Sequence, residues 1–146
     1  NNNFDKEILN FLQLKNKGIL GICLGMQLFF ESSEEFGFTK GLEILEGKVK
    51  KFLINKDRIP HIGWNKIKFK EQNKIFNYKL NNKNFYFVHS YYCKPSNKKS
   101  ILSLTKYNEI DFCSSILEKN IFATQFHPEK SGKYGVQFLK KIIRIL

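Results

Sequence analysis

A short apolar run that delivers a cysteine between two glycines constrains the fold of this chain more than any other feature. The apolar stretch in ILGIC, residues 19–23, is too short for a helix and predicts a buried strand, and a helical pattern begins with LGMQLFF. Gly21 and Gly25 flank Cys23. A buried strand that ends at such a residue just before a helix is typical of α/β folds, whose sites form at the carboxyl ends of strands.

The rest of the chain alternates helical and strand-like patterns, as an α/β fold requires. Helical spacing predicts a first helix within residues 4–18, a second from residue 24 to near Gly37, and an amphipathic helix in GKYGVQFLKKIIRIL at the end. Strand-like segments occupy residues 41–52, 60–69, 84–93, 99–108 and 114–129.

Composition narrows the class of protein. The 146 residues carry a formal net charge of +12, but the lysines are scattered through every segment, so we interpret them as a solvated surface and not as a nucleic-acid face. Neither end has a long apolar run or the pattern of a secretory signal. We expect one cytoplasmic domain over residues 1–146, with no nucleic-acid or membrane partner, whose true beginning lies upstream because the chain lacks an initiating Met.

The cysteine pattern argues against a disulfide framework and against a zinc site. Cys23, Cys93 and Cys113 are odd in number, widely spaced and without a C-x-x-C pair. We expect no metal and no cofactor, and we interpret Cys93 and Cys113 as small core or half-exposed apolar side chains.

The setting of Cys23 favours nucleophilic chemistry. A nucleophile on a sharp strand-to-helix turn has a strained backbone, and small neighbours leave room for the turn and for a substrate. The helix beginning there is expected to lower the pKa of the thiol and to offer backbone N–H groups to an oxyanion. Taken alone, GICLG fits a structural cysteine beside packing glycines about equally well.

A second motif supplies a base. His127 and Glu129 in FHPE lie two residues apart at the expected end of a strand, so their side chains project to the same side and the carboxylate can orient the imidazole. Thiol acyl transfer requires such an oriented base. H-P-E alone is more often a surface turn, whereas the two motifs in this order are far more specific.

These segments resemble the class I (triad) glutamine amidotransferases. The resemblance rests on GICLGMQLFFESSEE at 21–35, GLEILEGKVKKF at 41–52, IPHIGWNKI at 59–67, FYFVHSYY at 85–92 and FATQFHPEKSG at 122–132. Within this family the segments are similar to those of the glutaminase subunit of imidazole glycerol phosphate synthase. The resemblance implies a flavodoxin-like three-layer α/β fold with a mixed central sheet.

The resemblance also implies the chemistry. Cys23 would attack the side-chain amide of glutamine to form a γ-glutamyl thioester and release ammonia, and water would then free glutamate. His127 would be the general acid and base, and Glu129 its orienting partner. The substrate-binding positions would be Leu24, whose N–H is an oxyanion donor, with Gly25 and Gln27, and His89, Ser90 and Tyr91 acting through backbone groups.

Ammonia released into water would be lost, so the resemblance implies a heterodimer in which a (β/α)₈ cyclase subunit receives it. That partner adds the nitrogen to a ribulosyl-aminoimidazole-carboxamide nucleotide and yields imidazole glycerol phosphate and a second carboxamide product, AICAR, in histidine biosynthesis. The positions that match the docking and tunnel-mouth region are His61, Ile62, Trp64, Asn65 and Lys130.

One part of the family pattern is not matched. Members begin with a strand and a glycine-rich segment, commonly P-G-x-G, whose backbone completes the oxyanion hole, and nothing like it precedes Cys23. The resemblance therefore implies an N-terminally truncated domain with an uncovered sheet edge. The absent donor would impair the chain by about a hundredfold or more in rate.

Two other interpretations stay open. A paralogous glutaminase that supplies ammonia to a nucleotide-sugar or surface-polysaccharide amidotransferase would use the same chemistry with a different partner. A catalytically silent docking module would use the fold only to bind a partner, and the intact Cys23, His127 and Glu129 weigh against it.

Overall fold

The computed structural model describes residues 3–53, 58–70, 76 and 79–145. The helices are α1 (Phe4–Leu12), α2 (Leu24–Leu28), α3 (Gly132–Ile143) and the 3₁₀ turn η2 (Pro128–Lys130). The strands are β1 (Ile19–Ile22), β2 (Phe30–Ser33), β3 (Thr39–Lys40), β4 (Leu45–Lys51), β5 (His61–Lys66), β6 (Lys68–Phe69), β7 (Asn84–His89), β8 (Tyr91–Pro95), β9 (Ile101–Tyr107), β10 (Ile110–Glu118) and β11 (Ile121–Thr124).

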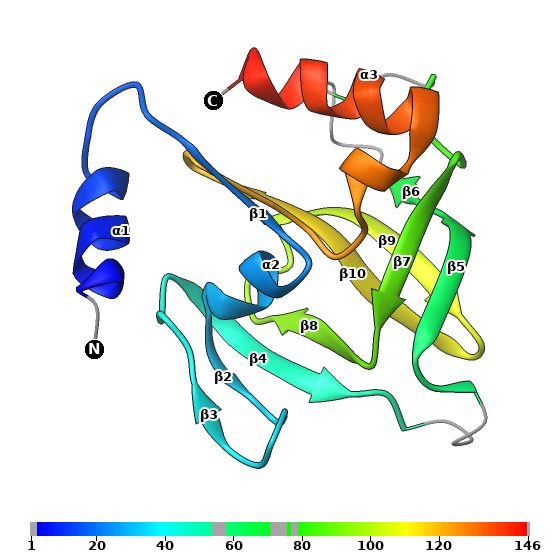
Figure 1. Ribbon diagram of the computed structural model, residues 1–146, viewed down its shortest axis with the longest axis horizontal. Helices are drawn as coiled ribbons and strands as arrows, with labels where there is room; N and C mark the ends of the chain where they lie inside the picture. Colours follow the sequence, from blue (N-terminus) through cyan, green and yellow to red (C-terminus); the bar gives the residue numbers. More distant parts are fainter. Residues whose placement is uncertain (1–2, 54–57, 71–75, 77–78, 146) are drawn as a thin grey trace.

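The strands form a mixed sheet with two smaller sheets beside it. The largest sheet has the order β1-β11-β10-β9-β6, in which β1 and β11 are parallel and the other neighbours antiparallel. A four-stranded sheet has the order β3-β2-β4-β8, and β5 pairs with β7. In Figure 1, α3 lies on one side of β1 and β10, and the four-stranded sheet lies on the other, with α2 between it and β1. The predicted α/β class with a mixed sheet is confirmed.

The parallel pair β1–β11 positions the site. Ile22 is the register partner of Thr124, and the N–H of Cys23 donates to the Thr124 carbonyl at 2.7 Å. Carboxyl ends of parallel strands meet at one edge of a sheet, so the residues after β1 and β11 start side by side. In the described part of the chain, the other edge of β1 is unpaired.

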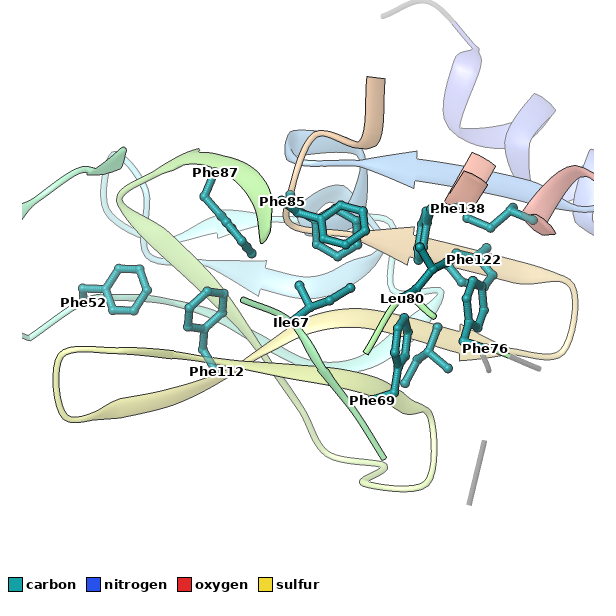
Figure 2. Close-up of a cluster of buried hydrophobic side chains, with 13 residues drawn as sticks. Phe52, Ile67, Phe69, Phe76, Leu80, Phe85, Phe87, Phe112, Phe122 and Phe138 are labelled. Carbon is teal, nitrogen blue, oxygen red and sulfur yellow. The ribbon is translucent and has the colours of Figure 1, made fainter. Parts of the chain in front are cut away.

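Phenylalanine dominates the first of two core clusters. Figure 2 shows rings from strands and helix α3 packed together, among them Phe85, Phe87, Phe122 and Phe138, all of them fully buried. The second cluster lies around α2, β4 and β10. It contains both Cys93 and Cys113, so their prediction as small core side chains is confirmed.

The second helix is much shorter than predicted. It ends at Leu28, and Phe30–Ser33 form strand β2, which pairs with β3 and β4. The alternating burial of Phe30 and Ser32, with Glu31 exposed between them, shows why the strand forms: side chains of period two cover the core, and serines are poor helix formers. The prediction of a helix to near Gly37 was wrong because the LFF run fits both periods.

Helix α1 stands apart from the sheets in Figure 1. It buries none of its residues, although its apolar side chains Phe4 and Leu9 lie in an amphipathic pattern; Phe4 is 68% exposed. Phe4 and Leu9 are therefore uncovered, whereas Leu12 at the end of the helix packs against the second core cluster.

Candidate active site

Cys23 sits on the strained turn that the sequence predicts. Its backbone has φ 52° and ψ −106°, between the end of β1 and the start of α2. A residue other than glycine rarely adopts a positive φ, and such strain gathers at functional sites. The Cys23 carbonyl accepts from the N–H groups of Met26 and Gln27 at 3.1 and 3.2 Å, so the first turn of α2 fixes this conformation.

The two flanking glycines have different tasks. A Cβ on Gly21 would lie 2.5 Å from the Phe29 ring and 2.8 Å from the backbone of Gly25, so only glycine lets α2 pack this closely on β1. A Cβ on Gly25 would meet nothing within 4 Å. Gly21 thus makes the turn possible, and Gly25 borders open space next to the nucleophile candidate.

Amide side chains and a strand carbonyl surround the thiol. Cys23 Sγ lies 3.9 Å from the Val88 carbonyl and accepts from Gln125 Nε2 at 3.7 Å. Gln125 Oε1 in turn accepts from Gln27 Nε2 at 3.1 Å. Gln125 is fully buried, and sequence reasoning missed it. The available signal was an amide within the apolar strand IFATQF, two residues before His127.

Burial raises the pKa of the Cys23 thiol above its ordinary value. The N–H of Leu24 and the Gln125 amide lower it, and the carboxylates of Glu129 and Glu35 raise it further. The expectation of a lowered pKa was wrong, since α2 has only five residues and the thiol is desolvated. The resting group is therefore a thiol that needs a base to lose its proton.

One ring nitrogen of His127 is hydrogen-bonded to Glu129, and the other has no hydrogen-bond partner among the described residues. Its Nδ1 lies 2.6 Å from Glu129 Oε1, so Nδ1 carries the proton. Its Nε2 is buried and has no hydrogen-bond partner among the described residues. The N–H of His127 donates to the Tyr86 carbonyl at 2.8 Å, which ties the motif to β7. The hydrogen-bond partners of the thiol, Val88 and Gln125, do not include the His127 ring.

A cavity of about 210 Å³ begins beside the nucleophile turn. Its lining includes Leu24, Gln27, Glu35 and Lys40, and the Lys40 ammonium pairs with Glu43 at 3.1 Å. Sequence reasoning missed the part of the lining that follows Leu28, because the second helix was expected to continue to near Gly37.

The segment 89–91 contributes backbone groups and not the His89 ring. His89 is 6% exposed and its ring faces the core. The Tyr91 carbonyl accepts from Gln27 Nε2 at 3.2 Å, and the Ser90 carbonyl accepts from the Phe52 N–H at 3.2 Å. The substrate contacts expected of this segment stay a prediction.

The β5 positions that were expected at the partner interface lie on two different faces of this strand. Ile62 and Trp64 are 60% and 57% exposed, and Lys130 is exposed beside the HPE motif. His61 is only 3% exposed, and the half-buried Asn65 donates its amide to the Lys106 carbonyl at 2.9 Å. A direct partner contact by the His61 ring is therefore incompatible with this structure.

Neither a metal cluster nor a membrane-spanning helix occurs within the described ranges. No three His, Cys, Asp or Glu side chains gather there as a metal ion requires. No helix there is long and apolar enough to cross a bilayer.

Comparison with known proteins settles the family. The model of the family "Glutamine amidotransferase class-I" matches residues 2–145. The chain belongs to this family. The predicted family, and with it the predicted class of enzyme, is thereby confirmed.

Curated relatives of this amidotransferase chain are subunits of one synthase. The imidazole glycerol phosphate synthase subunit HisH of Chlorobaculum tepidum is 47% identical over 137 residues, which cover 94% of this chain and 68% of the relative. HisH of Pyrococcus furiosus is 47% identical over 131 residues, covering 90% and 66%. A relative from Chlorobium chlorochromatii is covered to 62%. The chain thus spans about two thirds of the length of these HisH-like relatives.

Solved structures share the amidotransferase fold at low identity. A glutamine amidotransferase from Thermotoga maritima has a TM-score of 0.58 at 17% identity, covering 98% of this chain and 52% of that one. A GMP synthase subunit from Thermoplasma acidophilum has a TM-score of 0.64 at 23% identity, covering 97% and 61%.

Proposed function

We propose that this chain carries the glutaminase site of an imidazole glycerol phosphate synthase, as the names of its HisH relatives suggest. One observation carries the proposal: the strained Cys23 and the His127–Glu129 pair follow two strands, β1 and β11, that are parallel neighbours. Hydrolysis would yield glutamate and ammonia, and the ammonia would pass to a cyclase subunit that makes imidazole glycerol phosphate and AICAR.

Proton transfer starts the reaction. Because the pKa of the thiol is raised, Cys23 is protonated at rest, and the free Nε2 of His127 takes the proton as Sγ attacks the amide carbon. Glu129 holds the Nδ1 proton and stabilises the imidazolium that forms. The N–H of Leu24 faces the developing oxyanion, and a second donor from a P-G-x-G segment stays a prediction.

Collapse of the tetrahedral intermediate breaks the C–N bond. His127 returns its proton to the leaving nitrogen, which departs as ammonia and leaves a γ-glutamyl thioester on Cys23. A water then attacks the thioester with His127 as base, and the thiol is regenerated with glutamate as product. Atoms and protons balance without a metal or cofactor.

The cavity beside Leu24 and Gln27 fits the amino-acid end of glutamine. Glu35 there would accept from the α-ammonium group, and Lys40 would exchange its ion pair with Glu43 for one with the α-carboxylate. The side-chain amide would then point back toward Cys23.

Ammonia would leave across the outer face of β5 and β7. Trp64 contacts Tyr86 with ring centroids 6.1 Å apart, and Tyr86 contacts His127 at 6.5 Å. With Ile62 and Lys130 these rings form an exposed apolar surface with a basic edge close to the base. An exposed tryptophan of this kind is a typical interface anchor.

Isotope transfer tests this function. The full-length protein is mixed with the cyclase from the same organism, its nucleotide substrate and glutamine labelled with ¹⁵N in the side-chain amide. We expect the label in the imidazole ring of the product, with glutamate formed in equal amount. Glutamate formed only with a sugar-nucleotide aminating partner would replace the proposal by the paralogue, and no glutamate with any partner would favour the silent docking module.

A further inference from the structure

Two histidines outside the catalytic pair face one another in the core. His61 and His89 are register partners across β5 and β7, and Nδ1 of His61 lies 3.1 Å from Nε2 of His89. The rings of Phe52, Phe87 and Phe112, labelled in Figure 2, pack around the pair at centroid distances of 4.8 to 5.9 Å. A polar pair in such apolar surroundings must have its hydrogen bonds satisfied.

The partners at the two ends fix where the protons are. Nδ1 of His89 lies 2.7 Å from the Tyr91 carbonyl, which only accepts, so this nitrogen carries the proton. Nε2 of a neutral His89 must then accept, and His61 must donate through Nδ1. Nε2 of His61 accepts in turn from Asn65 Nδ2 at 3.4 Å. All these bonds run in one direction, from Asn65 to Tyr91.

The chain of bonds ends at the active site. The Tyr91 carbonyl accepts hydrogen bonds both from Nδ1 of His89 and from Nε2 of Gln27. Gln27 binds Gln125, and Gln125 donates to the Cys23 sulfur. The carbonyl of Val88, next to His89, lies against the thiol itself.

We propose that Asn65, His61 and His89 are positioning residues, a one-way hydrogen-bond chain of neutral rings that holds the Tyr91 carbonyl and, through Gln27 and Gln125, the thiol of Cys23. The role in catalysis rests on the proposed function, whereas the arrangement of protons does not. A charged His89 would set two N–H groups against each other at the His61 contact.

Burial also favours the neutral form of both rings. It lowers the pKa of His61 to about 4 and that of His89 to about 3. Positive charge on His61 or His127 would lower the pKa of His89 further, and the Tyr91 carbonyl opposes this. Tyr107, stacked on His61 at 3.9 Å, turns its hydroxyl away to the Arg58 carbonyl. Both rings therefore stay neutral at physiological pH.

Nitrogen-15 NMR of the full-length protein tests the chain without any assay of function. With only three histidines in this sequence, long-range ¹H–¹⁵N spectra can assign each ring. We expect His61 and His89 to carry the proton on Nδ1 and to show no titration down to pH ~5, about a unit or more below an ordinary histidine. An Nε2–H tautomer of either ring, or its titration above that pH, would overturn the proposal.

His61→Phe tests the link to the thiol, since it keeps an aromatic ring between Phe87 and Tyr107 but removes the N–H that donates to Nε2 of His89. His89 then loses the bond that fixes its ring, and the Gln125 contact that favours the thiolate loosens. We expect alkylation of Cys23 by iodoacetamide, followed by peptide mapping, to slow by about threefold or more at fixed pH. The control Tyr107→Phe keeps the ring stacked on His61 and should leave the rate unchanged. Equal rates in wild type and a folded His61→Phe would refute the link, and because iodoacetamide needs no glutamine site, this result is independent of the proposed function.

Discussion

Cys23→Ala is expected to lower glutamine hydrolysis by at least about a thousandfold, because no other group can form the thioester. Synthesis from added ammonium salt by the complex should continue, since the cyclase site is untouched. Glutamate release and product formation, measured in parallel on the full-length complex, give the two rates.

The chain offers a matched control for this substitution. Cys113→Ala removes the same sulfur atom from the buried second core cluster, where burial raises the pKa of the thiol to about 12. Its activity should stay near that of the wild type. Residual hydrolysis in Cys23→Ala within tenfold of wild type would remove Cys23 from the mechanism.

His127→Ala is expected to lower kcat for glutamine hydrolysis by about 10²- to 10⁴-fold, the usual contribution of a general acid and base. The reason is the raised pKa of the Cys23 thiol, which leaves Sγ protonated unless Nε2 of His127 accepts the proton. Hydrolysis rates over a range of pH measure the effect. The remaining activity should rise with pH as hydroxide deprotonates the thiol.

Two further variants show whether the loss in His127→Ala is due to the catalytic pair. Glu129→Gln keeps a hydrogen-bonding group near Nδ1 but removes the charge that stabilises the imidazolium, so a smaller loss is expected. Gln137→Ala, on the exposed face of α3, should have no effect. If His127→Ala retains the wild-type kcat and pH profile, the proton acceptor is another group.

The sequence predicts those parts of the fold whose signals are local. The short run at β1, the alternating patterns of β4 and β7 and the amphipathic terminal helix α3 all appear where expected. The continuation of the second helix beyond Leu28 was predicted wrongly because the apolar run LFF fits a helix or a strand. The pairing of β2 with β3 and β4 makes this segment a strand, and such pairing is a tertiary contact that the local pattern does not show.

In the candidate site, too, the parts that short motifs determine were predicted, and the parts that depend on tertiary contacts were not. The strained turn at Cys23 follows from GICLG, and the contact of His127 with Glu129 follows from their spacing. Gln125 reaches the thiol only because β11 lies parallel to β1. The inward His61 was placed at the interface with its neighbours, although alternation along a strand puts it opposite to Ile62. The direction of the thiol pKa depends on burial, which no short motif reveals.

Mass spectrometry after exposure to a glutamine-mimicking electrophile tests whether Cys23 is the nucleophile of a glutamine-binding site. The full-length protein is treated with and without excess glutamine, and the modified peptides are mapped. We predict a single modification, on Cys23, that glutamine suppresses, while the buried Cys93 and Cys113 stay unmodified. Failure to modify Cys23, equal labelling of all three cysteines, or labelling that glutamine does not slow would contradict it.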